Sequence, residues 1–387
     1  MTHSRYGRPV WAEIDLAALQ HNVRELRTFL GGKADILAVV KAEAYGHGPV
    51  EISRQLEREG IKTLAVASFD EAVVLREAGV SRDILVLGYT PAYLYLDLQH
   101  YKIEQSIISA EMLADFTRMA AQFGPLPVQG KIDSGMGRLG VRADEAVPFL
   151  TNLFETFGNS VQGIFTHFAV ADRNAEDSRD QLRTYLKVLD PFYRKHPTLK
   201  RHAANSAGTI SLRESWLDGV RPGLLLYGTS PIAGVAPPLD LRPVMRVKAR
   251  VVQVKKIRAG ESVGYGHRFH AERDSHIAII PIGYGDGYPR ALSERSYMLL
   301  HGKHAPVIGN MSMDFSIVDV TDIANVKAED EAVVLGGDIT AWSLADLIQS
   351  IPYEIFCGLG KRISRIYLPP PDATDEAQTP AAPAPKN

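Results

Sequence analysis

The first side chain that could act as a nucleophile is Lys41, which directly follows the apolar run at residues 36–40. A short continuous run rich in β-branched residues is typical of a strand buried on both faces in a parallel sheet. A lysine at the end of such a strand lies at the rim where α/β folds bind ligands. Partial burial there would lower the pKa of the amine and make it nucleophilic, although a rim lysine pointing to solvent has the same spacing.

Further polar side chains stand where other strand-like runs end. They occur in the segments GKIDSGMGRLG, GIFTHFAVAD, HAANSAG and DGVRPGLLLYG, and they are Lys131, Asp133, Arg138, His167, Asn205, Ser206, Arg221, Gly223 and Tyr227. If these runs form one barrel, their ends converge on one mouth and the residues share a pocket. Taken singly, His167 is more often a core histidine, and Asn205 and Ser206 could simply cap the next helix.

Ser206 and Gly223 follow the last two of these runs, where such barrels often hold a phosphate group. Backbone N–H groups and the dipole of a helix beginning at Ser206 would attract a phosphate. A lysine nucleophile across the mouth from a phosphate pocket indicates pyridoxal phosphate, held as a Schiff base.

Two competing motifs are weaker. Residues 135–140, GMGRLG, fit the dinucleotide pattern G-x-G-x-x-G, but they lie mid-chain and place Arg138 where the backbone should be bare. Four histidines of the C-terminal half lack metal-ligand spacing and have no cysteine pair beside them: His267, His270, His301 and His304. No metal site is therefore predicted.

The elements that would position these residues alternate along the chain. Strand-like runs end near Lys41, Phe69, Tyr89, Ser109, Asp133, Ala169, Ser206 and Tyr227. Helix-like segments lie between most of them, at 49–59, 70–78, 110–122, 145–157, 177–193 and 206–214. This alternation predicts a closed (β/α)8 barrel within residues 11–240, with an open doubly wound sheet as the alternative. A strand at 11–16, followed by a helix at 16–30, could instead join the second domain.

Beyond residue 240 short alternating runs separated by turn residues predict a mainly antiparallel β domain over 241–368. One run covers 245–257, a helix is expected at 342–350, and a last strand at 362–368. The segments SVGYG, GYGDGYPR and GNMSMDF could be plain hairpin turns, yet they would expose Tyr265, Tyr284, Asp286, Met313 and Asp314. Residues 1–10 are expected to be a loose leader, and the Pro/Ala-rich residues 369–387 a disordered tail.

Composition narrows the class of protein. Hydrophobic residues at 45% and charged residues at 23% are typical of a globular protein. A net charge of −2 provides no electrostatic reason to expect a nucleic acid or an anionic membrane as partner. The single cysteine, Cys357, cannot form an intrachain disulfide and fits a reducing compartment, so a cytoplasmic location is expected. No apolar run has the length of a signal peptide or a transmembrane helix.

Taken together and in order, these motifs resemble those of the bacterial alanine racemases, which are fold-type III pyridoxal phosphate enzymes. The resemblance extends from about Trp11 to Tyr367 and rests on the blocks AVVKAEAYGHG, KIDSGMGRLG, THFAVAD, HAANSAG, VRPGLLLYG, VGYG, GYGDGYPR, GNMSMD and YEIFCGLGKRISRIY. It implies a homodimer with active sites shared between subunits. It also implies two-base interconversion of L-alanine and D-alanine, which supplies D-alanine for peptidoglycan.

The resemblance also implies residue roles. Lys41 would bind the cofactor and serve as one acid–base group, and Tyr265 from the partner subunit would be the other. Arg221 would face the pyridine nitrogen, with His167 between Arg221 and Tyr265. The phosphate and the rest of the cofactor would be held by Tyr45, Asn205, Ser206, Tyr353 and the backbone of Gly223 and Leu224.

Substrate binding is implied for a second group. Arg138 would bind near the substrate carboxylate and would be oriented by Lys131, which CO2 would carbamylate. The substrate-binding residues of the β domain would be Tyr284, Met313 and Asp314, the last two supplied by the partner.

Three alternatives stay open. A racemase of broader specificity could accept serine, because pockets reject one added hydroxyl poorly. A fold-type III amino-acid decarboxylase would need a wider pocket and a partner cysteine, whereas Cys357 stands in a different block. A non-enzymatic pyridoxal phosphate-binding protein would resemble the barrel alone.

Overall fold

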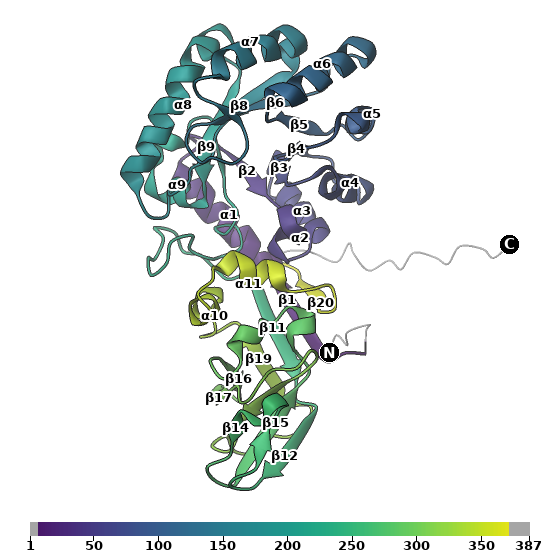
Figure 1. Cartoon of the computed structure of the whole chain (residues 1–387), viewed down its shortest axis with the longest axis vertical. Helices are drawn as coiled ribbons and strands as arrows, with labels where there is room; N and C mark the ends of the chain where they lie inside the picture. Colours follow the sequence, from purple (N-terminus) through teal and green to yellow (C-terminus); the bar gives the residue numbers. More distant parts are fainter. Residues whose placement is uncertain (1–6, 371–387) are drawn as a thin grey trace, which may run out of the picture.

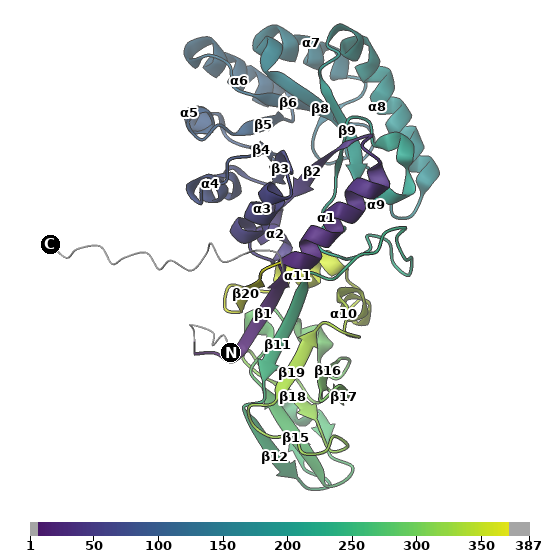
Figure 2. The same cartoon turned by 180° about the vertical axis from the view of Figure 1, so that it is seen from behind.

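The computed structural model describes residues 7–370, which form a helix-wrapped barrel and a β-rich domain at opposite ends of the long axis (Figure 1). Part of the expected leader and nearly all of the expected tail lie outside the described residues. The view from behind shows α1 (Leu16–Leu30) running from the junction of the two domains along the barrel (Figure 2).

Eight parallel strands close into a barrel. Their order is β5-β4-β3-β2-β10-β9-β8-β6, and β5 also pairs with β6, which completes the circle. The strands are β2 (Asp35–Val39), β3 (Thr63–Val66), β4 (Asp83–Val86), β5 (Glu104–Ile107), β6 (Val128–Asp133), β8 (Val161–Phe165), β9 (Lys200–Asn205) and β10 (Gly219–Arg221). The predicted (β/α)8 barrel is therefore confirmed, and the open doubly wound sheet is wrong.

Helices cover the outside of the barrel because each buries an apolar face against the strands. They are α1, α3 (Pro49–Arg58), α4 (Phe69–Glu77), α5 (Tyr95–His100), α6 (Ala110–Phe123), α7 (Ala146–Phe157), α8 (Ala175–Lys195) and α9 (Ser206–Ser211). Side-chain caps set several starts: Asp15 caps α1, Ser68 caps α4 and Ser109 caps α6. Helix α8 begins two residues before the predicted start, because Asn174 accepts hydrogen bonds from the N–H groups of Glu176 and Asp177.

Three boundaries differ from the predictions. The eighth barrel strand ends at Arg221 rather than near Tyr227, because Pro222 has no N–H and the chain then turns through bonds such as Leu226 N to Gly223 O. The helix expected at 206–214 stops at Ser211 and is followed by a separate 3₁₀ turn, η3 (Arg213–Ser215). The short helices α5 and α11 (Pro352–Gly358) were not predicted, since each is too short to show a clear period.

The second domain contains a six-stranded sheet in the order β17-β16-β19-β11-β1-β20 and a three-stranded sheet, β12-β15-β18. The first strand, β1 (Val10–Asp15), lies in the larger sheet, antiparallel to β11 and parallel to β20. The other strands are β11 (Met245–Arg250), β16 (Tyr297–Leu300), β17 (Lys303–Pro306), β19 (Glu331–Leu335), β20 (Ser364–Leu368), β12 (Gln253–Ile257), β15 (Ser275–Ile280) and β18 (Ser316–Asp319).

Two predictions for this domain need correction. The run at 245–257 is two strands in two different sheets, β11 and β12, with a break at residues 251–252. The helix expected at 342–350 is α10 (Ala341–Leu347), which is capped by Thr340.

The expected leader is partly anchored. Arg8 forms an ion pair with the fully buried Asp286, at 2.5 Å from Oδ1 and 2.9 Å from Oδ2. The same carboxylate accepts the Gly283 N–H at 3.0 Å. Asp286 is therefore a structural residue of the turn at 283–287, and the expectation that this turn exposes it is wrong.

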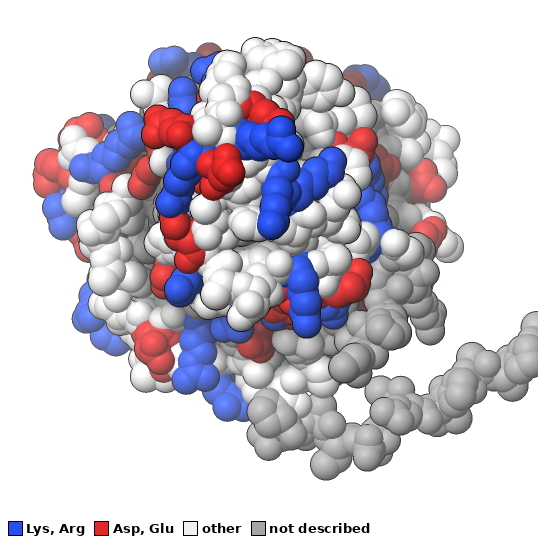
Figure 3. All heavy atoms as spheres, turned by 90° about the horizontal axis from the view of Figure 1, so that it is seen from below, with Lys and Arg blue, Asp and Glu red and all other residues white. Residues whose placement is uncertain are grey.

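The surface of the far end of the β-rich domain carries lysine and arginine side chains interspersed with acidic ones (Figure 3). This mixture agrees with the small net charge. Within residues 7–370 no helix combines the length and the apolar character needed to cross a membrane.

Candidate active site

Lys41 begins an unusual backbone turn, α2 (Lys41–Tyr45), at the carboxyl end of β2. The next four residues are all left-handed: φ is +52° at Ala42, +57° at Glu43, +51° at Ala44 and +54° at Tyr45. Left-handed backbone costs about 1–2 kcal/mol for each L-residue, so other contacts must hold this turn. Such strain is concentrated at functional sites, where it fixes the direction of a reactive side chain.

Glu71 of α4 is one such contact. Its carboxylate accepts the Ala42 N–H at 2.7 Å with Oε1 and the Ala67 N–H at 2.7 Å with Oε2. It thereby ties the residue after Lys41 to the segment that follows β3. From the β-rich domain, Arg365 donates to the Gly46 carbonyl at 3.0 Å, so both domains hold the turn.

The environment of Lys41 favours a neutral amine. Burial is the main cause of its lowered pKa, and the positive charges of Arg138 and Arg221 lower it further. Lys131 and His167 are affected by the same charged groups, so five basic side chains gather at one mouth of the barrel. This concentration of positive charge suits an anionic ligand.

Tyr45 and Gly223 form a close cradle beside this mouth. A Cβ added at Gly223 would lie 2.4 Å from the Tyr45 hydroxyl, and the Gly223 N–H donates to Ser206 Oγ at 2.8 Å. Two hydroxyls and bare backbone at the start of α9 are suitable ligands for a phosphate group. Tyr353 of α11 completes this side, with its ring centroid 5.7 Å from that of Tyr45.

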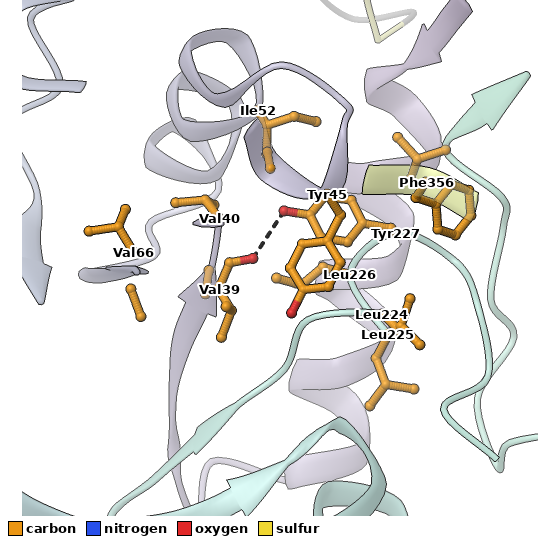
Figure 4. Close-up of a cluster of buried hydrophobic side chains, with 14 of the residues drawn as sticks. Val39, Val40, Tyr45, Ile52, Val66, Leu224, Leu225, Leu226, Tyr227 and Phe356 are labelled. Atoms are coloured by element: carbon orange, nitrogen blue, oxygen red, sulfur yellow. Dashed lines mark hydrogen bonds between the residues drawn. The ribbon is translucent and has the colours of Figure 1, made fainter. Parts of the chain in front are cut away.

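The rings behind the cradle are fixed by the core. Figure 4 shows Tyr45 and Tyr227 between the end of β2 and the segment 224–227, with the Tyr227 hydroxyl bonded to the Val39 carbonyl at 3.0 Å. Leu224 is fully buried beside them. Burial raises the pKa of Tyr45 and raises that of Tyr353 to about 12, so both phenols stay neutral hydrogen-bond partners.

Asn205 and Ser206 have different roles. Asn205 caps α9, because its Oδ1 accepts the Gly208 N–H at 2.9 Å, so the capping alternative holds for this residue. Ser206 is buried and interacts with Gly223 across the cradle.

Arg221 is the best-anchored charged group of the mouth. It is buried and donates to His202 Nδ1 at 2.6 Å, to the Thr166 carbonyl at 2.6 Å and to the Ala203 carbonyl at 3.0 Å. His167 Nδ1 lies 3.3 Å from the same guanidinium. Burial lowers the pKa of Arg221 to about 10 and, together with the charge of Arg221, holds His167 in its neutral form with a pKa well below its ordinary value.

Lys131 lies buried on β6, with its ammonium 5.5 Å from the centre of the Phe165 ring. Burial, reinforced by the charges of Arg221, Arg138 and Lys41, lowers the pKa of Lys131 to about 8. Asp133 organises the glycine-rich loop instead of joining the basic group, since its Oδ1 accepts the N–H groups of Gly135 at 2.9 Å and Met136 at 2.8 Å. The GMGRLG segment is thus a carboxylate-centred loop, and Arg138 on it is exposed at the mouth.

Of the predicted residues in the β-rich domain, Tyr353 belongs to this mouth, whereas Tyr265 lies apart from it within one chain. Tyr265 belongs to η4 (Tyr265–His267), between β13 (Ser262–Val263) and β14 (Phe269–His270), in the part of the domain distant from the barrel (Figure 1). It is 72% exposed, Met313 is 52% exposed and Tyr284 is 43% exposed. The segments pack together, because the Asn310 side chain donates to the Tyr265 carbonyl at 2.7 Å and Gly285 N–H donates to the Met313 carbonyl at 2.8 Å.

Asp314 of this cluster is an ion-pair partner rather than a free carboxylate. Its side chain is bonded by Arg362, and its carbonyl accepts from Arg8 at 3.2 Å. Across the described residues, no group of three or more His, Cys, Asp or Glu side chains has the geometry of a metal site.

Sequence reasoning missed three residues that position the mouth: Glu71, His202 and Thr166. Glu71 stands in an ordinary acidic first helical turn, which is a frequent capping pattern. His202 and Thr166 lie within or just after apolar strands, and only the pairing of β8, β9 and β10 brings them to Arg221.

Family models match both halves of the chain. Residues 14–231 match the alanine racemase N-terminal domain and residues 244–367 the alanine racemase C-terminal domain. The chain is 39% identical over 368 residues to an alanine racemase of Desulfovibrio desulfuricans, with 94% of this chain and 99% of the relative covered. It is 38% identical over 372 residues to that of Halothermothrix orenii, with 94% and 98% covered.

Solved structures agree with these matches. An alanine racemase of Clostridium difficile superposes with a TM-score of 0.89 at 33% identity, covering 94% of this chain and 97% of that one. The Bartonella henselae alanine racemase with covalently bound pyridoxal phosphate superposes with a TM-score of 0.84 at 31% identity, covering 93% and 99%. With both domains matched and its relatives spanned almost end to end, this chain belongs to the alanine racemase family.

Proposed function

We propose that this protein is a pyridoxal phosphate-dependent alanine racemase that interconverts L-alanine and D-alanine. The observation that carries the proposal is the position of Lys41 at the start of a strained turn next to the cradle formed by Tyr45, Ser206 and Gly223. A nucleophilic amine and an anion cradle at one barrel mouth are the two requirements for holding this cofactor.

The residues present fit the cofactor. The Tyr45 and Ser206 hydroxyls, which meet beside the bare backbone of Gly223, suit the phosphate group, and Tyr353 and the backbone of Leu224 would complete its site. Lys41 would hold the cofactor covalently, and Arg221 would face its ring nitrogen. When bound, pyridoxal phosphate supplies a conjugated ring that withdraws electron density from the substrate Cα–H bond.

The cationic Arg221 would keep a proton away from the ring nitrogen of a bound cofactor. Its guanidinium can only donate hydrogen bonds, and His202 and two carbonyls fix its orientation. A proton on the ring nitrogen would therefore face a fixed positive charge. With such a partner the cofactor would withdraw electrons less strongly, which would favour return of the proton to Cα.

Lys41 would move a proton at one face of the substrate, since burial lowers the pKa of its amine and so favours the neutral form that can accept a proton. The second proton would be moved by the Tyr265 hydroxyl on the opposite face. Within one chain Tyr265 is exposed and belongs to the other domain, so the proposal requires Tyr265 from the partner subunit of a homodimer. Tyr284 and Met313 are exposed in the same cluster and would reach the partner's mouth together with Tyr265.

Arg138 would bind the substrate carboxylate, and Lys131 would set its orientation after carbamylation. In that step the neutral Lys131 amine attacks the carbon of CO2, an N–C bond forms, and one proton leaves. The product is an anion beside the cationic Arg138 and Arg221, so attraction replaces the repulsion that adds to burial in lowering the Lys131 pKa. Asp314 would support binding of the substrate carboxylate only indirectly, because its own side chain is already bound by Arg362.

The test is incubation of the purified, cofactor-loaded protein with L-alanine, and separately with D-alanine, followed by chiral analysis. Each enantiomer is expected to give the racemic mixture, and in D2O the product is expected to carry deuterium at Cα. Release of CO2 instead would identify a decarboxylase, and equal turnover of L-serine would identify a broader racemase. No change in either enantiomer would overturn the proposal.

A further inference from the structure

The barrel has a second opening at the end opposite Lys41. A cavity of about 710 Å³ is lined there by residues at the starts of the strands, among them Asp35 of β2, Thr63 of β3, Asp83 of β4 and Glu104 of β5. Lys41 and the cradle adjoin the carboxyl ends of the strands, so this cavity is separate from the proposed active site.

Glu104 lines the cavity with a largely buried carboxyl group. The residue is only 9% exposed, and its Oε1 has no hydrogen-bond partner among the described residues. Burial raises its pKa to about 7, an interaction with the Gln129 side chain partly opposes the rise, and the charge of Asp83 adds to it. A buried carboxyl without a partner is costly, so a cationic ligand would find a strong partner here.

The rim of the cavity carries both charges, since the exposed Asp83 lines it together with three lysines. Lys62 and Lys102 line it and are exposed, and neither forms an ion pair in the part of the chain that the structure describes. The third rim lysine, Lys200, is already paired with Asp35 at 3.3 Å. A ligand seated in the cavity would therefore meet an acid at depth and free amines at the rim.

We propose that this cavity binds a small zwitterion, with the ligand's ammonium group on the Glu104 carboxylate and its carboxylate on Lys62 and Lys102. The cavity exceeds the size of one small amino acid, so the class that fits is an amino acid with a long side chain or a dipeptide. Nothing in the proposed racemase chemistry uses this end of the barrel.

A hydrogen-bonded chain connects the cavity to the other mouth. Arg221 is a donor only, so His202 Nδ1, at 2.6 Å from it, must be the unprotonated nitrogen. The proton of the neutral ring is then on Nε2, which donates to Gln129 Oε1 at 2.6 Å. Gln129 and His202 both line the cavity, so a ligand bound there would disturb the chain that runs from Gln129 through His202 to Arg221.

The binding test uses isothermal titration calorimetry of the holoenzyme with glycylglycine as the probe. Wild-type protein is expected to bind one glycylglycine per chain saturably, and Glu104→Gln about tenfold or more weakly. Glu155→Gln, an exposed acid on α7, is the matched control and should bind like wild type, as should Lys41→Ala, which alters only the opposite mouth. N-acetylglycine lacks the ammonium group and should not bind.

Several results would overturn the site: no saturable heat with wild type, an unchanged affinity in Glu104→Gln, loss of binding in Lys41→Ala, or equal binding of N-acetylglycine. The connection is tested by NMR of protein labelled with ¹⁵N-histidine. Because His202 lines the cavity itself, the connection is read at His167, which lies beside Arg221 at the other mouth. Glycylglycine should move the His167 ring resonances in wild type and leave them unmoved in His202→Phe. An unmoved His167 in wild type would disprove the connection. Neither measurement depends on racemisation. A failure of this binding site can therefore be told apart from a failure of the proposed racemase function.

Discussion

The carboxylate of Glu71 on α4 holds the backbone N–H of Ala42, the residue next to Lys41, at 2.7 Å. Because the other oxygen of Glu71 holds Ala67, the ends of β2 and β3 are joined by one side chain. The left-handed turn that follows Lys41 therefore depends on a residue that would not touch the substrate.

Replacing Glu71 by Gln should loosen this turn. One of the two oxygens becomes an NH2 group, which cannot accept a backbone N–H, so we expect a loss of about 1–2 kcal/mol in the free energy of unfolding. Racemisation should fall more than cofactor binding, since the cradle is intact. Urea unfolding and kcat measurements check this, with the exposed neighbour Asp70→Asn as control; equal behaviour of the two variants would contradict it.

Gly223→Ala should block the cradle. The new Cβ would lie 2.4 Å from the Tyr45 hydroxyl, so either the ring or the backbone must move out of the position that suits a phosphate. We expect the affinity for pyridoxal phosphate to fall by about tenfold or more while the fold persists. Equilibrium dialysis and circular dichroism measure both, and Gly7→Ala, which meets open space, is the control. Unchanged cofactor affinity would argue against the cradle.

Mixing two inactive variants tests whether sites are shared between subunits. Lys41→Ala and Tyr265→Phe homodimers should each be nearly inactive, but a heterodimer contains one site with both native residues. After denaturation and joint refolding of equal amounts, about a quarter of the wild-type activity should return. Activity of the mixture no higher than the sum of the separate variants would show that each site belongs to one chain.

Carbamylation of Lys131 should be visible and pH-dependent. The reaction needs the neutral amine, and the pKa of Lys131 is lowered to about 8, so at constant dissolved CO2 the modified fraction should rise between about pH 7 and pH 9. Protein equilibrated with ¹³CO2 should show a carbamate carbon resonance that is absent from Lys131→Met. The exposed Lys33→Met variant should retain it, and a resonance that survives in Lys131→Met would assign the carbamate elsewhere.

The buried Glu104 should make stability fall as pH rises. Its pKa is about 7 in the folded protein against an ordinary 4.5, so the folded state binds more protons than the unfolded state between these values. The stability from this group is complete at low pH and lost as pH passes 7. Glu104→Gln should therefore be more stable than wild type at pH 8, by up to about 3 kcal/mol, and nearly equal at pH 4.5. Urea unfolding at both pH values tests this, with Glu155→Gln as control; a difference that does not change with pH would refute it.

Much of the fold could be predicted because its signals are local. Seven of the eight barrel strands span four to six residues, several of them are apolar runs such as DILAV in β2 and TLAV in β3, and several of the helices carry side-chain caps at their starts. The eighth strand was predicted to extend too far along the chain. The apolar residues 224–227 that follow Arg221 are buried in a turn rather than in the sheet. Periodicity reports burial, and it does not distinguish a buried turn from a strand.

By itself, the sequence determined the barrel, the β-rich domain and the candidate residues at the strand ends, with Lys41 first among them. Those features follow from hydrophobic period and from short motifs, each readable within about ten residues. Tertiary structure alone decided which of these residues are held by hydrogen bonds or ion pairs to other parts of the chain and which are not. Asp286 is bound by Arg8 across 278 positions, Arg221 is fixed by His202, and Glu104 is left without a partner at the other end of the barrel. Such pairings depend on which strands become neighbours, and a side chain's own surroundings in the sequence do not contain that information.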